Sequence, residues 1–135
     1  MRENSVYNEF LNSGHIIIGM SGGEGWGLPE FHSTAIGKHA VLLNAHAYKS
    51  WATPEAVTFV NPNGKIDAID GAFFRQGDAF NQGSIFDWRE DEFVAGCEQA
   101  IKKVESSPTN TEGLKLQQEY TKDKFLDNVI NLLKS

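Results

Sequence analysis

One stretch decides how this chain folds, Ser21-Gly22-Gly23-Glu24-Gly25-Trp26-Gly27-Leu28-Pro29. An apolar run, residues 15–20, comes directly before it, and a second apolar run, residues 40–44, follows. The glycines around one carboxylate leave backbone N–H groups without side-chain cover, and Pro29 suits the first turn of a helix. The order strand, glycine-rich turn, helix predicts an anion-binding turn, because free amides and the helix dipole both favour negative charge. The alternative is a tight strand-to-helix turn that binds no ligand.

The flanking segments predict a βαβ unit. We expect a strand over residues 15–20, a helix from Pro29 to Ile36 that stops at Gly37, and a parallel strand over residues 40–44. Because residues 15–20 are apolar and rich in β-branched side chains, we expect this strand to be covered on both faces.

The rest of the chain continues the alternation of helices and strands. An Asn-Pro-Asn-Gly turn is expected at 61–64, and an ordered loop over 71–84 is expected to be anchored by Phe73, Phe74 and Phe80. The other predicted elements are a helix over 5–12, strands over 57–60 and 65–70, a return to the core at 85–87, and helices over 90–106 and 111–134. This order predicts a single α/β domain over 1–135, Rossmann-like, with a mainly parallel sheet flanked by helices.

Composition excludes several classes of protein. The 135 residues are 40% hydrophobic and 22% charged, which is typical of a globular domain. The net charge of −6 argues against nucleic acid as a partner. No apolar run approaches the roughly 20 residues that span a bilayer, and the polar start is unlike a secretory signal, so we expect no membrane insertion and a cytoplasmic location. Cys97 is the single cysteine, and we expect it to be a buried apolar residue on a helix.

No metal site is expected. His32, His39 and His46 recur every seven residues, but they fall on a helix, at a strand start and in a loop. Such positions have no common geometric meaning for a ligand set.

The glycine-rich stretch and its flanks carry a family resemblance. Glu-Gly-Trp-Gly-Leu-Pro at 24–29, with a strand before it, resembles the C-terminal domain of GT-B glycosyltransferases. The similar group is the retaining, nucleotide-sugar-dependent one (glycosyltransferase group 1), in which Phe is usual where Trp26 stands. Residues 35–41 match the helix end and next strand of that domain, and residues 83–87 match more weakly. The resemblance covers about residues 5–105, is specific at 15–44, and implies part of a GT-B C-terminal domain.

The resemblance also implies roles for individual residues. By this resemblance, Glu24 is expected to be the catalytic-site residue that faces the donor sugar and accepts hydrogen bonds from its hydroxyls. The glycine turn and the helix start are expected to supply N–H groups that stabilise the departing diphosphate. No divalent metal and no cofactor are implied. The residues implied in donor binding are Gly22, Gly23, Gly25, Trp26, Gly27, Leu28 and His32.

Two positions depart from the family pattern. The second acid of the family, which holds the ribose hydroxyls, falls on His32, whose imidazole lacks a carboxylate's bidentate acceptor geometry. Glu30 is two residues away, nearly on the opposite helix face, and we expect His32 rather than Glu30 to take this role. The family's glycine pair after the second strand is replaced by Ala45-His46-Ala47. His46, Tyr48, Lys49 and Trp51 are there either donor contacts or loop-packing residues.

The resemblance leaves three functions to compare. The leading hypothesis is the donor-binding part of a nucleotide-sugar-dependent glycosyltransferase, binding a nucleoside-diphosphate sugar but inactive alone, because the acceptor domain of a complete GT-B enzyme has no counterpart in the chain. The alternatives are a non-catalytic nucleotide-sugar-binding module and a self-associating assembly module. We expect a homo-oligomer, because half of a two-domain enzyme exposes sheet edge and apolar surface. The donor base, the sugar, the acceptor and the fragment-or-complete question stay open at this point.

Overall fold

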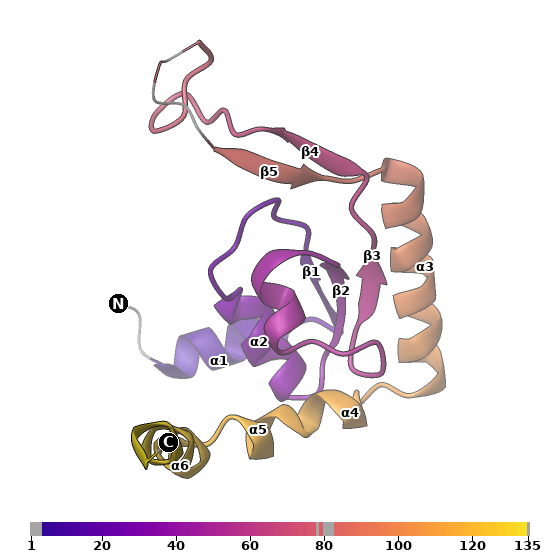
Figure 1. Cartoon of the computed structure of the whole chain (residues 1–135). Helices are drawn as coiled ribbons and strands as arrows, with labels where there is room; N and C mark the ends of the chain where they lie inside the picture. Colours follow the sequence, from indigo (N-terminus) through magenta and orange to yellow (C-terminus); the bar gives the residue numbers. More distant parts are fainter. Residues whose placement is uncertain (1–3, 78, 80–82, 135) are drawn as a thin grey trace.

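The fold is an α/β domain built on a three-stranded parallel sheet. The computed structural model describes residues 4–77, 79 and 83–134, so the predicted anchor Phe80 lies outside the described residues. The strands β1 (Ile16–Gly19), β2 (His39–Leu43) and β3 (Thr58–Val60) lie in the order β1-β2-β3, and both pairs are parallel. Helix α2 (Leu28–Ala35) connects β1 to β2, which confirms the predicted βαβ unit (Figure 1).

The central strand β2 is buried on both faces. Ala40 and Leu42 join a core cluster with Tyr48 and Trp51 on the side of α2. Val41 faces the other side, where it packs with Val60 against α3 (Glu90–Ser106). Gly96 allows this close approach, because a Cβ there would lie 2.9 Å from Cγ2 of Val60. The sheet therefore has one helical layer on each face, as the sequence predicted.

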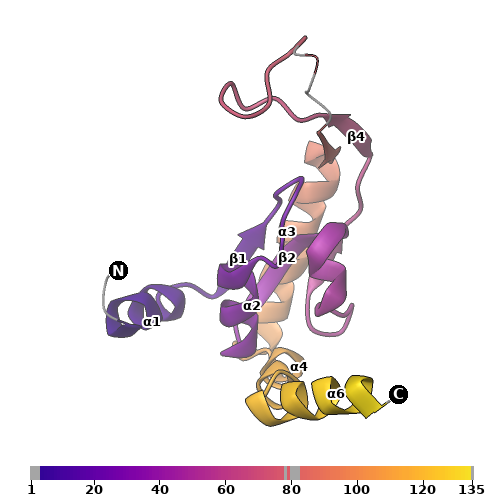
Figure 2. The same ribbon diagram turned by 60° about the vertical axis from the view of Figure 1, so that its left-hand side comes forward.

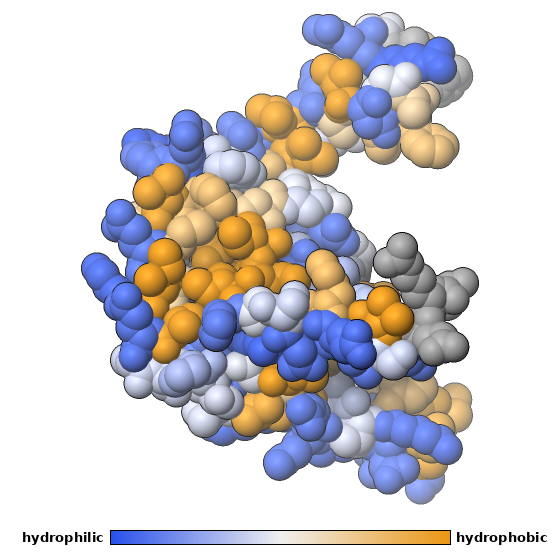
Figure 3. All heavy atoms as spheres, turned by 180° about the vertical axis from the view of Figure 1, so that it is seen from behind, coloured by the Kyte–Doolittle hydropathy of each residue, from blue (hydrophilic) through white to orange (hydrophobic). Residues whose placement is uncertain are grey.

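Strand β1 is less covered than the sequence predicted. Ile17 packs into the cluster on the α2 side and Ile16 packs into the cluster on the α3 side, but Ile18 is 50% exposed. The prediction of full cover on both faces was wrong because β1 is an edge strand, and β2 and β3 take most of the contact with α3. The view from behind shows a continuous apolar area in the middle of the molecule (Figure 3).

The predicted strand at 65–70 forms one side of a projecting hairpin rather than part of the main sheet. Strand β4 (Gly64–Asp67) pairs antiparallel with β5 (Ser84–Asp87), and the two stand above the sheet as an arm (Figure 1). Residues 85–87 were predicted to return to the core, but they are only half-buried. Phe73 is 89% exposed and is no anchor, whereas the Phe74 ring lies against Gly83.

The C-terminal part is broken into three helices, not the one long helix predicted over 111–134. They are α4 (Thr111–Leu114), α5 (Leu116–Glu119) and α6 (Lys122–Lys134). The chain leaves the helix at Tyr120, which has φ −107° and ψ 54° and whose hydroxyl donates to the Ser50 carbonyl at 3.0 Å. Thr121 begins a new helix by accepting the N–H of Lys124 at 3.3 Å. Helix α6 has no buried residue, and both it and α1 (Asn4–Asn12) extend away from the sheet (Figure 2).

Helix α3 confirms the boundaries predicted for it, residues 90–106. Along this helix Ile101 is 49% exposed, whereas Lys103 is half-buried. Lys103 Nζ donates to the Val57 carbonyl at 3.3 Å, and burial lowers the pKa of Lys103. Cys97 is half-buried in the same layer, and desolvation raises the pKa of its thiol. None of the helices in the described part of the chain has the length and apolarity that a bilayer crossing requires.

Candidate functional site: the glycine-rich loop

The glycine-rich loop, residues 20–27, runs from the carboxyl end of β1 to the start of α2. Its carbonyl groups are held by three other segments of the chain. The Ser21 carbonyl accepts from Nε2 of His46 at 2.7 Å, and the Gly22 carbonyl accepts from the Phe86 N–H at 2.8 Å. The Trp26 carbonyl accepts from Nε1 of Trp51 at 2.9 Å. These three hydrogen bonds hold the loop in place through its carbonyl oxygens.

The donors of the loop are free by contrast. Within the described residues, the backbone N–H groups from Glu24 to Leu28 donate no hydrogen bond. Only the Gly23 N–H has a partner nearby, the Ser21 hydroxyl at 3.4 Å. Leu28 is the first residue of α2, so these amides lie at the positive end of the helix dipole. Free N–H groups in this position are able to bind an anion.

The underside of the loop is packed against Tyr48, which comes from the 3₁₀ helix η1 (His46–Ser50). A Cβ at Gly27 would lie 2.3 Å from Cε1 of Tyr48, and Gly27 also has a positive φ of 74°. A Cβ at Gly19 would lie 2.7 Å from the Tyr48 hydroxyl. Both positions therefore require glycine, Gly27 for its backbone conformation as well as for space.

Three polar side chains gather beneath the loop. Tyr48 is fully buried, and its hydroxyl lies beside the Glu30 carboxylate without the geometry of a hydrogen bond to any atom. His46 Nδ1 is also buried without a partner, since Nε2–H is the donor to Ser21. His46 has a positive φ of 39° at the position where the glycosyltransferase pattern carries a glycine pair.

Burial shifts the pKa values of this group. Desolvation raises the pKa of Glu30, and the nearby Glu24 carboxylate raises it further, while its own backbone N–H and the adjacent Tyr48 hydroxyl act in the opposite direction. Desolvation also raises the pKa of the Tyr48 hydroxyl, with both carboxylates adding to the effect. Two carboxylates therefore lie at this site, the exposed Glu24 in the loop and the half-buried Glu30 beneath it on α2.

The other predicted donor-binding residues lie in different surroundings. Trp26 is half-buried and packs edge-on against Phe31 and Tyr120, with ring centroids 5.7 and 5.6 Å apart. Leu28 is 55% exposed beside the free amides. His32 points away from the loop toward α1, where Nδ1 is hydrogen-bonded to the Tyr7 hydroxyl at 3.1 Å.

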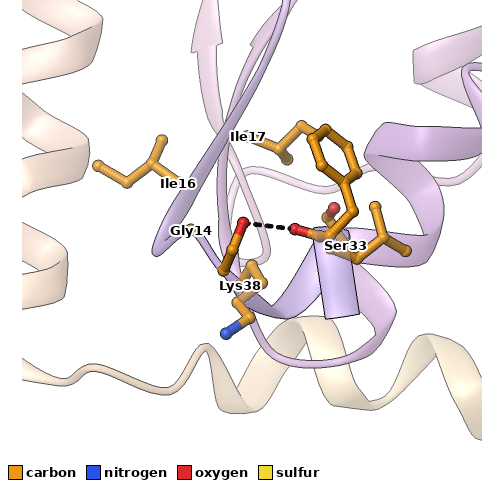
Figure 4. Close-up of a pocket in the computed structure, with 8 residues that line it drawn as sticks. Gly14, Ile16, Ile17, Ser33 and Lys38 are labelled. Atoms are coloured by element: carbon orange, nitrogen blue, oxygen red, sulfur yellow. Dashed lines mark hydrogen bonds between the residues drawn. The ribbon is translucent and has the colours of Figure 1, made fainter. Parts of the chain in front are cut away.

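Two concave surfaces among the described residues lie away from the loop. One of about 120 Å³ lies at the opposite, amino end of β1, between α1 and α2, and Gly14, Ile16 and Lys38 line it (Figure 4). A shallower groove of about 520 Å³ between α1, α2 and α5 contains His32 and Tyr7. His32 therefore lines a groove beside α1, away from the loop that carries Glu24.

Sequence reasoning missed the position of Glu30. It favoured His32 as the replacement for the second family acid, but the structure brings Glu30 beneath the loop beside Glu24. A signal was present, because Glu30 lies three residues after Gly27, in the first turn of α2, where acidic side chains turn toward the helix start.

Comparison of the chain with known protein families, with curated proteins and with solved structures gives no match. Among the described residues, no three His, Cys, Asp or Glu side chains are arranged to hold a metal ion.

Proposed function

We propose that this chain is the donor-binding part of a nucleotide-sugar-dependent glycosyltransferase. The observation that carries the proposal is the set of unpaired N–H groups from Glu24 to Leu28 at the start of α2. They lie at the carboxyl edge of a parallel sheet, where open α/β folds bind their ligands. The diphosphate binds these amides, and the exposed Glu24 carboxylate accepts hydrogen bonds from the sugar hydroxyls.

The proposal requires little change of the loop on binding. Its carbonyls already bond to His46, Trp51 and Phe86, and Gly27 already packs on Tyr48. The donors are thus held in place by contacts that a ligand does not have to break. Donors fixed before the ligand arrives stabilise negative charge without further reorganisation.

We propose that the chain alone does not turn over a donor. Departure of a nucleoside diphosphate needs strong neutralisation of its charge, commonly from Arg, Lys or Mg²⁺. Residues 14–37 contain no Lys or Arg, so the amides act without a cation from the loop or from α2. Binding without turnover is the expected behaviour, and hydrolysis of a nucleotide sugar by the purified chain would contradict it.

The test is calorimetric titration of the purified chain with UDP-glucose, GDP-mannose and ADP-glucose. We expect millimolar or tighter binding of one of them. Glu24→Gln should weaken that binding about tenfold, because an amide accepts fewer and weaker hydrogen bonds than a carboxylate. Glu98→Gln on α3 makes the same charge change on the other face of the sheet and should leave the affinity unchanged. Absence of binding to all three nucleotide sugars would reject the proposal.

A self-associating module is the second candidate, and the exposed edge of the sheet favours it. Strand β1 has no partner on its outer side within the described residues, and Ile18 and Val94 are about half exposed. Such an edge is open to pairing with a second chain. We expect sedimentation to show a dimer at tens of micromolar, and Ile18→Lys to return the chain to a monomer. A monomer in the unsubstituted chain would count against this candidate.

A further inference from the structure

The glycine-rich loop combines an anion-binding surface with two carboxylates. Its free amides attract a negative ligand, yet Glu24 and Glu30 are the charged side chains nearest to them in sequence, and no Lys or Arg lies between residues 14 and 37. Ionised carboxylates repel a diphosphate at short range. One of the two must lose its charge or move for the anion to bind well.

Glu30 is the one that is unable to move away freely. Its side chain lies beneath the loop, where a Cβ added to Gly19 would be 2.7 Å from Cγ of Glu30. A Cβ added to Gly27 would be 3.0 Å from Oε2. The carboxyl group is therefore enclosed between the end of β1 and the start of α2, close to the amides that an anion would use.

The Tyr48 hydroxyl supplies the second observation. It is completely buried and has no hydrogen-bond partner among the described residues, and it lies next to the Glu30 side chain, because a Cβ added to Gly19 would be 2.7 Å from both the Tyr48 hydroxyl and Cγ of Glu30. An unpaired buried hydroxyl is destabilising, so a small shift that lets Glu30 accept a hydrogen bond from Tyr48 is favourable. In that position one carboxyl oxygen accepts from Tyr48, and the other oxygen faces the loop.

We propose that Glu30 is a ligand-binding residue that acts as a neutral carboxylic acid, donating its O–H to the diphosphate of the nucleotide sugar. This inference rests on the proposed function. On binding, the Glu30 carboxylate takes one proton from solvent, and the new O–H donates to a phosphate oxygen. Tyr48 is the positioning residue that orients the acid.

The surroundings favour the neutral form. Desolvation already raises the pKa of Glu30, and Glu24 from the loop adds to this effect. Among the described residues, the Tyr48 hydroxyl from η1 lies next to Glu30 with His46 beside Tyr48, and Glu30 also raises the pKa of the Tyr7 hydroxyl on α1. The diphosphate adds negative charge next to Glu30, which raises its pKa further. Affinity should therefore fall as the pH rises above the pKa of Glu30 in the free chain, by up to about tenfold per pH unit.

The test is calorimetry with the tightest-binding nucleotide sugar, from pH 5.5 to 8.5, in two buffers of different ionisation enthalpy. A nucleotide sugar is suitable because its diphosphate is fully ionised across this range. We expect uptake of close to one proton per ligand at the upper part of the range. Glu30→Gln, which resembles the neutral acid, should show no uptake and should bind at pH 8.5 as tightly as the unsubstituted chain does at pH 5.5. Glu98→Gln is the matched charge control and should keep the proton uptake.

The outcomes separate this inference from the function on which it rests. Binding that is independent of pH, or unchanged pH dependence in Glu30→Gln, would overturn the role of Glu30 while leaving donor binding intact. Weaker binding of Glu30→Gln at every pH, in a variant whose melting temperature is unchanged, would also overturn it. Absence of binding at any pH in both proteins would reject both proposals.

Discussion

The two ends of helix α2 differ in whether their backbone polar groups are hydrogen-bonded. At its amino end, the N–H groups from Glu24 to Leu28 have no partner among the described residues. At its carboxyl end, the Ala35 carbonyl accepts from Gln117 at 2.6 Å, and the Gly37 carbonyl accepts from the Asn110 N–H at 2.8 Å. One short helix thus has a carboxyl end whose carbonyls are hydrogen-bonded to the C-terminal segment, the sealed end, and an amino end whose donors have no partner among the described residues, the open end.

This difference corresponds to the two edges of the sheet. The sealed end lies at the amino edge with α4 and α5, and the open end lies at the carboxyl edge with the loop. Substitutions of packed residues at either end should change the free energy of unfolding, whereas substitutions of exposed residues at the open end should change ligand binding. The predictions below test that division.

The largest loss of stability is expected for Asn110→Ala. The Asn110 amide is buried, donates to the carbonyls of Lys38 at 3.1 Å and Ala56 at 2.7 Å, and accepts the Gly113 N–H at 3.0 Å. Removing it leaves three backbone groups unpaired, which should lower the free energy of unfolding by about 3 kcal/mol. Urea denaturation measures this loss.

Asn12→Ala is the matched control for that substitution. Asn12 is exposed, and its side chain bonds only within its own helix, to the Asn8 carbonyl at 3.0 Å. Its removal should change stability by less than about 0.5 kcal/mol. Similar losses in the two variants would contradict the prediction that the buried hydrogen bonds of Asn110 at the amino edge of the sheet stabilise the fold.

The next largest loss of stability is expected for Gly27→Ala, because the underside of the loop is closely packed at Gly27. A left-handed alanine with its Cβ 2.3 Å from the Tyr48 ring should lower the free energy of unfolding by about 2 kcal/mol. Gly25→Ala is the control, since a Cβ at Gly25 meets nothing within 4 Å. Thermal melting of the two variants should differ by several degrees, and equal melting temperatures would show that the loop is not packed as described.

The sequence predicts those features of the fold that local residue patterns determine, and it does not predict those that depend on contacts between residues distant in the sequence. The βαβ unit and the stop of α2 at Gly37 were predicted because local patterns determine them. The exposure of Ile18 was not, because it depends on how far α3 reaches across the sheet. The break at Tyr120–Thr121 was missed because it depends on contacts of Tyr120 with distant residues, a hydrogen bond to the Ser50 carbonyl and packing on Trp26.

In the candidate site, too, local features were predicted from the sequence and features that join distant residues were not. The loop and Glu24 were recognised from adjacent residues, and they remain a prediction until binding is measured. The place of Glu30 beneath the loop was not predicted, because helical phase alone does not show which face of α2 meets the loop. The proximity of Glu30 to Tyr48 involves residues from two elements, and no local spacing predicts it.

The smallest effect is expected for Tyr7→Phe. This change removes the hydrogen bond to Nδ1 of His32 on the α1 side of α2. The bond is exposed, so stability should fall by only about 0.5 kcal/mol, measured by urea denaturation. Because His32 faces away from the loop, nucleotide-sugar affinity should not change. A clear loss of affinity would place His32 in the donor site and restore the role that the family resemblance implies.

The hydrogen bond from the Phe86 amide to the Gly22 carbonyl links the β4–β5 arm to the glycine-rich loop, so hydrogen exchange in the arm can report on the loop. This amide belongs to β5, yet its exchange with heavy water is controlled by the loop, because exchange requires the bond to open. Deuterium uptake at that one position therefore reports from outside the site on how often the loop opens. A ligand that steadies the loop would slow this uptake without touching the arm.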